Sequence, residues 1–146
     1  MDAERQSRIA VWSELVVAHD RLMKQFQTEL KTGFDLSVPQ YDALLRLSQA
    51  DGTCLRMGEV ADALLFSSGA ATKIFDRLVE RGLVERGADP NDRRTVLVGL
   101  TDDGRALFRR AQLAHGDSIH DKLGPFASAD ERQHVEAFLE RLAASG

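Results

Sequence analysis

The chain has 146 residues, of which 43% are hydrophobic and 29% are charged, and its formal net charge at pH 7 is −4. This size fits one domain with a hydrophobic core, and the acidic balance argues against a protein that coats nucleic acid through bulk positive charge. No apolar run approaches the roughly 18 residues of a membrane helix, and the first residues lack the layout of a signal peptide. We therefore expect a cytoplasmic globular protein. Its single cysteine, Cys54, cannot form an internal disulfide and is expected to be a half-buried thiol.

Apolar residues at three- and four-residue steps predict one long helix from about residue 3 to residue 32. Gly33 is expected to end this helix in the left-handed conformation. At 1.5 Å per residue the helix would be about 45 Å long, which is more than a core of this size needs, so part of its stripe should contact another chain. The stripe consists of Ile9, Trp12, Leu15, Val16, His19, Leu22, Met23, Phe26 and Leu30.

The next stretch has the pattern of two further helices with a short strand between them. Ser37 and Gln40 form a capping box, which predicts that a helix begins there, and Gly52 lies in the turn that ends it. Residues 53–56 are a candidate strand, and residues 58–64 a candidate short helix. The inward face of the first of these helices would be Tyr41, Leu44, Leu45 and Leu47.

A helix, a β-hairpin and two more helices complete the predicted order. Ser67 is a candidate N-cap for a helix that Gly82 ends, with Ala71, Ile74, Phe75, Leu78 and Val79 facing inward. Residues 83–86 and 95–100 are candidate strands joined through residues 87–92. Thr101 would cap a helix that runs to Gly124 and Pro125, and Ser128 with Glu131 forms a second capping box. The inward residues of the last helix would be Val135, Phe138, Leu139 and Leu142.

A short helix, a tight turn and a second helix followed by a hairpin predict a winged helix-turn-helix. In that arrangement the second helix lies in the major groove of DNA, with its first residues toward the base edges. Hydroxyl, ammonium and guanidinium groups are the donors that can bind phosphates and base edges there. By itself this pattern fits an ordinary amphipathic surface helix equally well. The candidate DNA-binding residues of the helix are Ser67, Ser68, Ala70, Thr72, Lys73 and Arg77.

Two adjacent arginines at the hairpin, Arg93 and Arg94, strengthen the DNA-binding interpretation. They are neighbours of Asp89 and Asp92, but exposed salt bridges stabilise a fold by only about 0–1 kcal/mol, so folding explains the pair poorly. An arginine that a carboxylate holds in place is well suited to the narrow minor groove, where the negative potential is strongest. We therefore expect the hairpin to be a DNA-binding wing.

The sequence resembles the MarR family of winged helix-turn-helix transcriptional regulators. The resemblance rests on PQYDALLRL, MGEVADAL, SSGAATKIFDRLVERGLVER and DPNDRRTVLVGLTDDG, in this order, and it is strong over about residues 37 to 110. It implies a mainly α fold with a small β-hairpin wing in a single domain over residues 1–146. Residues of about 37–100 would form the winged DNA-binding part, and residues 1–33 and 101–146 the dimerisation helices.

The resemblance also implies a function. It points to an obligate homodimer on a palindromic double-stranded DNA operator, with half-sites about 10 bp apart, that represses nearby genes until a small effector of unknown identity releases it. No cofactor or metal is expected, and no membrane contact. The first and last helices would form the interface, through Ile9, Trp12, Leu15, Phe138, Leu139 and Leu142.

Roles in DNA binding carry over by position. Lys73 matches a residue that contacts base edges, Arg94 matches the arginine of the minor groove, Asp92 would help to orient Arg94, and Arg93 would lie nearer the phosphates. Two positions depart from the family pattern. Ala70 replaces a common hydroxyl residue, and Arg56 stands where a threonine or serine usually caps the third helix.

Family effectors bind between the dimerisation helices and the winged part, which makes Trp12, His19 and Tyr41 the candidate ligand residues. Aromatic residues on an apolar stripe more often form packing contacts, so this alternative stays open. The hydroperoxide-sensing branch of the family uses a cysteine in the first helix, and this chain has none there. We therefore do not expect that mechanism.

The sequence also bears on two other classes of function. An enzyme is not expected, because His115 and His120 are about 140° apart on a helix and no nucleophile, base or phosphate-binding loop has the required spacing. A winged-helix module that binds a protein, without specific DNA binding, remains the alternative. Steep weakening of DNA binding by salt would distinguish the two.

Overall fold

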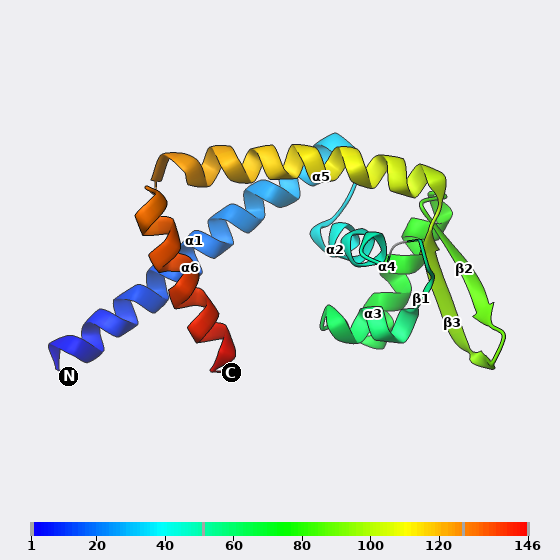
Figure 1. Ribbon diagram of the computed structural model, residues 1–146, viewed down its shortest axis with the longest axis horizontal. Coiled ribbons are helices and arrows are strands. Elements are labelled where there is room, and N and C mark those ends of the chain that lie inside the picture. The colour runs from blue at the N-terminus through cyan, green and yellow to red at the C-terminus, as the bar shows by residue number, and fades with distance from the viewer. Residues whose placement is uncertain (1, 51, 127, 146) are drawn as a thin grey trace. The chain divides into compact units, whose positions relative to one another are not determined.

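The computed structural model describes residues 2–50, 52–126 and 128–145. Among them lie α1 (Ala3–Phe34), α2 (Val38–Ser48), β1 (Leu55–Arg56), α3 (Met57–Ala63), α4 (Ser68–Glu80), β2 (Val84–Asp89), β3 (Asp92–Leu100), α5 (Asp102–Leu123), the short 3-10 turn η1 (Gly124–Phe126) and α6 (Ala129–Ala144) (Figure 1). The chain divides into two compact units, Met1–Gln112 and Leu113–Gly146. The predicted class, mainly α with a small β-hairpin wing, is confirmed.

Local capping signals begin four of the described helices, as the sequence predicts, and one of them is Thr101 at α5, whose hydroxyl accepts from the Gly104 N–H at 3.0 Å. The Ser37 hydroxyl accepts a hydrogen bond from the Gln40 backbone N–H at 3.2 Å, and the Gln40 side chain accepts one from the Ser37 N–H at 2.9 Å. Ser128 and Glu131 make the same reciprocal pair at α6. Ser67 accepts from the Ala70 N–H at 3.2 Å. These bonds satisfy backbone donors that have no partner within the first helical turn.

The end of α1 differs from the prediction. The helix continues through Gly33 to Phe34, and Asp35, with φ 52°, takes the left-handed position that the sequence assigned to Gly33. The guanidinium of Arg81 donates to the carbonyl oxygens of Phe34 at 2.9 Å and of Asp35 at 2.5 Å. This long-range arginine supplies the donors that the last carbonyls of α1 lack, so the helix does not need a glycine to end.

The sheet has the strand order β1-β3-β2, and both pairs are antiparallel. The hairpin is longer than predicted, because Gly87 and Ala88 pair with Leu97 and Val96 instead of lying in a loop. Its turn is short: the Asp89 carboxylate accepts a hydrogen bond from the Asn91 N–H at 2.9 Å, which closes the chain around Pro90. Arg93 and Arg94 therefore lie on β3, close to the turn.

The core of the first unit lies between the end of α1, α2, α4, the sheet and the beginning of α5. Tyr41 of α2 and Phe108 of α5 pack with ring centroids 5.5 Å apart. At the start of α5, Gly104 lies so close to the Leu83 backbone that a Cβ there would be 1.9 Å from the Leu83 carbonyl oxygen. The largest fully buried side chains are Leu36, Leu44, Val60, Phe75, Leu78, Val84 and Val98.

The second unit contains the last part of α5, η1 and α6. The 3-10 turn at Gly124 ends α5 where the sequence predicts the break. The expectation of an inward face on α6 is wrong for a single chain, because no residue of α6 is buried. A partner would have to cover its apolar side chains. Within the described part of the chain, no helix combines the length and apolar character needed to cross a membrane.

Candidate nucleic-acid interface

The first half of α4 presents an exposed polar face. Ala71, Phe75 and Leu78 are buried, which turns the opposite side of the helix to solvent. All six residues predicted for DNA binding at this helix are exposed, which are Ser67, Ser68, Ala70, Thr72, Lys73 and Arg77. The Thr72 hydroxyl donates to the Ser68 carbonyl at 3.0 Å, so its oxygen remains an acceptor. Small and hydroxyl side chains at the helix start allow close approach of a ligand's surface.

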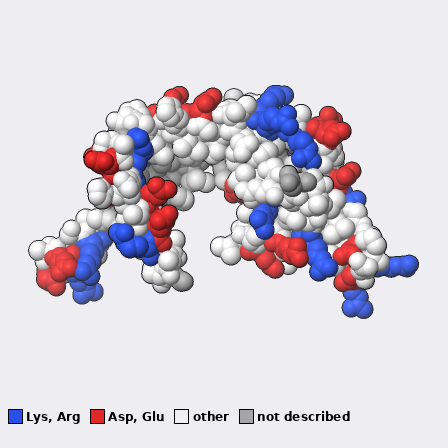
Figure 2. All heavy atoms as spheres, in the orientation of Figure 1, with Lys and Arg blue, Asp and Glu red and all other residues white. Residues whose placement is uncertain are grey.

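The wing places two further cations near the turn. Arg93 and Arg94 are exposed on β3, and neither guanidinium forms an ion pair with a described residue; the same holds for the Lys73 ammonium. In Figure 1 the hairpin tip and α3, with the beginning of α4, lie along the lower edge of the view. Figure 2 shows basic groups along that edge, interspersed with acidic groups. Arrangement, and not net charge, makes this edge a candidate surface for an anion.

Asp92 holds the wing backbone. One carboxylate oxygen accepts from the Arg94 backbone N–H at 3.0 Å, and the other accepts from the Thr95 hydroxyl at 3.1 Å. The expected orientation of Arg94 by Asp92 therefore acts through the backbone, since no bond joins the carboxylate to the guanidinium. This leaves the Arg94 side chain available for a ligand.

Asp89 fixes the hairpin to the start of α3. Its side chain is buried, with 8% of the residue exposed, and it pairs with the Arg56 guanidinium at 3.3 Å. Arg56 occupies the N-cap position of α3 and makes no side-chain capping bond. The departure at Arg56 thus exchanges a helix cap for an ion pair between residues 33 positions apart. This ion pair joins the wing to the helix-turn-helix.

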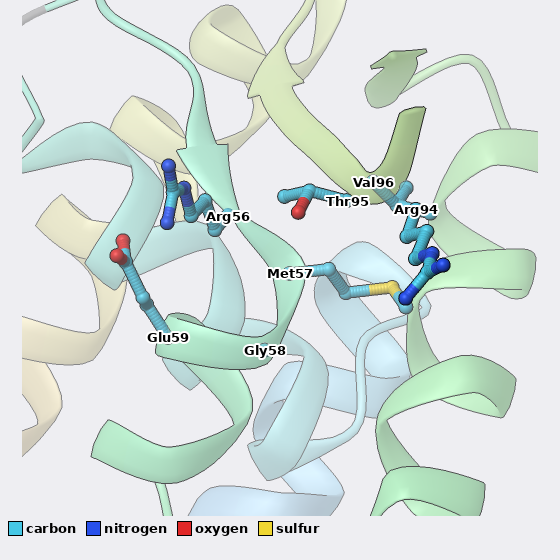
Figure 3. A pocket seen from close by; sticks show the side chains of 7 residues that line it. All are labelled: Arg56, Met57, Gly58, Glu59, Arg94, Thr95 and Val96. Atoms are coloured by element: carbon cyan, nitrogen blue, oxygen red, sulfur yellow. The ribbon is translucent and has the colours of Figure 1, made fainter. Parts of the chain in front are cut away.

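A pocket of about 350 Å³ lies beside the Arg56–Asp89 ion pair, between the start of α3 and β3. Figure 3 shows the side chains of Met57, from α3, and Arg94, from β3, on the same side of it, with Arg56 on the other. A second ion pair, Arg86 with Asp76 at 2.7 Å, joins β2 to α4. These two pairs hold the wing relative to α3 and α4.

The three candidate ligand residues are not brought together. Tyr41 is buried in the core beside Phe108, and this burial, followed by the charge of Asp42, raises the pKa of its hydroxyl. Leu30 belongs to the same core, and Trp12 lies 18 residues earlier on α1, about 27 Å along the helix. Trp12 is 62% exposed, and His19 is exposed beside Asp20 at 3.2 Å. A shared pocket at these residues would need a second chain.

The predicted dimerisation residues are exposed on each unit. Ile9 and Trp12 lie in the exposed first half of α1, and Leu15 there is half-buried. In the other unit Phe138, Leu139 and Leu142 of α6 are each more than 40% exposed. Cys54, expected to be half-buried, is exposed instead. Its sulfur lies close to Gly99, because a Cβ added at Gly99 would be 2.8 Å from it.

Sequence reasoning missed Leu65. It lies in the turn between α3 and α4 with φ 57° and is 91% exposed. Glycine or asparagine usually marks the left-handed residue after a helix, and the run LLF after α3 contains neither. The absence of a helix stop signal within a tight turn was the clue available in the sequence.

Comparisons with known proteins agree with this geometry. Residues 34–95 match the model of the MarR family. The multiple antibiotic resistance protein MarR of Escherichia coli strain K12 is 33% identical over 123 residues, which are 84% of this chain and 81% of the relative. The HTH-type transcriptional regulator PecS of Dickeya dadantii is 29% identical over 143 residues, 97% of this chain and 83% of that protein.

Solved structures have the same fold. A crystal structure of a MarR mutant from Escherichia coli complexed with operator DNA superposes with a TM-score of 0.79, covers 97% of this chain and 99% of that chain, and is 29% identical. A MarR family transcriptional regulator from Streptomyces coelicolor in complex with DNA gives a TM-score of 0.87 over 99% of this chain and 89% of that chain, at 23% identity. With the winged helix-turn-helix and the relatives above, these findings establish that the chain belongs to the MarR family of transcriptional regulators.

Proposed function

We propose that this regulator binds a pseudo-palindromic double-stranded DNA operator as a homodimer and represses transcription until a small effector releases it. The observation that carries the proposal is the set of exposed cations without an ion pair to a described residue, Lys73 on α4 and Arg93 and Arg94 on β3. The beginning of α4 and the hairpin tip lie along the same edge in Figure 1. Such groups bind phosphates and base edges when a recognition helix enters the major groove and a wing follows the minor groove.

Each part of the surface has a distinct role in this proposal. Lys73 contacts base edges in the major groove, with Ser67, Ser68, Thr72 and Arg77 toward the phosphates and Ala70 leaving room for the backbone. Arg94 enters the minor groove and Arg93 binds the adjacent phosphates. Asp92 and Asp89 do not bind the DNA but hold the wing in position.

The homodimer follows from the apolar side chains that each unit leaves exposed. A second copy that covers α1 and α6 would remove Trp12, Phe138 and Leu139 from water, which is the usual driving force for association. A symmetric pair would place two α4 helices on successive turns of one face of the DNA. We place the effector at this interface, with Trp12 and His19 as its first candidate contacts.

The family is one of transcriptional regulators and not of enzymes, and we propose that this member acts in the cytoplasm without a cofactor. Its relatives support the DNA-binding assignment by their names and complexes. The alternative, a winged module that binds a protein, predicts no salt-sensitive, sequence-selective binding of DNA.

The test is a fluorescence-anisotropy titration of the DNA just upstream of the chain's own gene, at two salt concentrations, against a scrambled duplex. We expect selective binding that weakens steeply with salt, because contacts to phosphates release counterions. Arg94→Ala should weaken binding about ten- to a hundredfold and leave the melting temperature unchanged. Arg109→Ala, which removes an exposed arginine of α5, is the matched control and should bind as the wild type does. Equal binding by the Arg94→Ala protein would contradict the minor-groove role.

A further inference from the structure

Leu65 has an unusual conformation and an unusual exposure. Its φ of 57° places it in the left-handed region, where a side chain with a Cβ meets the following carbonyl oxygen. The surrounding bonds show why the backbone turns there: the Phe66 N–H donates to the Ala61 carbonyl at 2.8 Å, and the Leu65 N–H donates to the Asp62 carbonyl at 3.2 Å. This pair of bonds is the Schellman ending of a helix, whose left-handed residue is usually glycine.

Folding alone disfavours leucine at this position. The Leu65 side chain is 91% exposed, so its burial contributes almost nothing to the stability of the fold. In addition, the left-handed backbone conformation is strained for a leucine. Glycine would remove the strain, and asparagine would reduce it. A bulky apolar residue that is both strained and exposed needs another reason to be there.

The position of Leu65 in the chain supplies one. Leu65 comes two residues before Ser67, the N-cap of α4, and α4 begins along the edge that also carries the hairpin tip (Figure 1). On the proposed function, on which this inference rests, the start of α4 lies in the major groove. The apolar groups that duplex DNA offers there are the C5 methyl groups of thymine and the carbon edges of deoxyribose.

We propose that Leu65 is a DNA-contacting residue whose side chain packs against apolar carbon groups of the operator beside the start of α4. The contact removes the exposed leucine from water and helps to set which base pairs the regulator accepts at the edge of each half-site. The turn fixes the direction of the Leu65 Cα–Cβ bond, so only the side-chain torsions become ordered when DNA binds.

The test uses the full-length protein and the duplex that the wild type selects from a random-sequence pool. Leu65→Asn suits the left-handed backbone better than leucine but removes the apolar side chain. We expect it to bind this duplex about four- to tenfold more weakly while melting at the same or a higher temperature. Leu65→Met keeps an apolar side chain of similar reach and should bind within about twofold of the wild type.

These variants separate contact from turn geometry. If Leu65 only shaped the turn, Leu65→Asn would bind at least as tightly as the wild type, and that result would overturn the proposal. Selection of no duplex by the wild-type protein would instead refute the proposed function, and the role of Leu65 with it. Selective binding by the wild type with unchanged binding by Leu65→Asn refutes the role of Leu65 alone.

A second set of duplexes identifies the group contacted. Replacing thymines one at a time by deoxyuridine removes only the C5 methyl group. A position at which the wild type loses affinity and Leu65→Asn does not would assign the contact to that methyl. If Leu65→Asn is weaker on the parent duplex but no such position exists, the contact is to deoxyribose carbons.

Discussion

Replacing Gly104 by alanine adds one methyl group at the junction of the wing and α5. A Cβ at this position would lie 1.9 Å from the Leu83 carbonyl oxygen and 2.7 Å from its carbon, both of them backbone atoms that cannot rotate away. Ordinary contacts between carbon and oxygen are more than 3 Å long, so the start of α5 must move away from Leu83 by more than 1 Å.

That movement strains the hydrogen bonds of Thr101. The Thr101 N–H donates to the Leu83 carbonyl at 3.1 Å, and the Thr101 hydroxyl donates to the Gly82 carbonyl at 2.6 Å. Loss of both bonds costs about 0.5–1.5 kcal/mol each, and overpacking about 1–3 kcal/mol more. The expected loss for Gly104→Ala is therefore roughly 2–6 kcal/mol, and the melting temperature should fall by about 5–20 °C.

The measurement is thermal unfolding followed by circular dichroism, with wild type and variants at one protein concentration, since association makes the melting temperature concentration-dependent. Gly116→Ala in the same helix is the control. Gly116 is exposed and a Cβ there meets nothing within 4 Å, so alanine should stabilise the helix by up to about 1 kcal/mol. If Gly104→Ala melted within 2 °C of wild type, the close approach to Leu83 would be wrong.

Three further predictions concern other features. Arg56→Gln leaves the buried Asp89 carboxylate without its ion pair and should lower the free energy of unfolding by about 1 kcal/mol, measured by chemical denaturation. Adding Asp89→Asn should recover part of this loss. If the losses of the two substitutions simply added, the stabilising ion pair would be contradicted. Leu15→Asp and Leu139→Asp should each yield monomers by light scattering while Glu136→Ala stays dimeric, and dimers in both aspartate variants would exclude the proposed interface. The hydrogen bond from the Ser128 backbone, and after it the one with the Ser128 side chain, lowers the pKa of Glu131 in the folded chain. The Glu131 carboxylate therefore stabilises the fold fully above the pKa that it has in the unfolded chain. This stabilisation is lost as pH falls through the lower pKa of the folded chain. The difference in melting temperature between wild type and Glu131→Ala should be present at neutral pH and disappear well below pH 4; a difference that persisted there would exclude this charge effect.

The features that the sequence predicts correctly depend on residues close together in the chain. The capping boxes at Ser37 and Ser128 each join residues three positions apart, and a backbone bond across one helical turn needs no distant partner. The order of helices and strands follows from the same local patterns. The DNA-binding role of Arg93 and Arg94 stays a prediction, and the structure adds that Asp92 binds the backbone N–H of Arg94.

Three features of the fold do not follow from the sequence pattern. Gly33 does not end α1, because Arg81, more than 45 residues away, binds the last carbonyls of the helix. Arg56 makes no helix-capping bond because a guanidinium has no acceptor, and the sequence does not predict that it pairs with Asp89, 33 positions further on. The left-handed turn at Leu65 contains neither glycine nor asparagine, the residues that usually mark this conformation. Each of these depends on a contact or a conformation that only the assembled fold supplies.

The bonds from Arg81 to the end of α1 also determine how motion can pass through the first unit. Arg81 follows the last turn of α4, so the C-terminal end of α4 is tied to α1, and the Asp76–Arg86 pair ties its middle to the wing. The N-terminal end, with Ser67, Ser68 and Lys73, makes no ion pair with another element of the described structure, and the burial of Ala71 and Phe75 holds it on the core. A displacement of the C-terminal end of α1 would therefore be passed to the C-terminal end of α4 through the two bonds of Arg81.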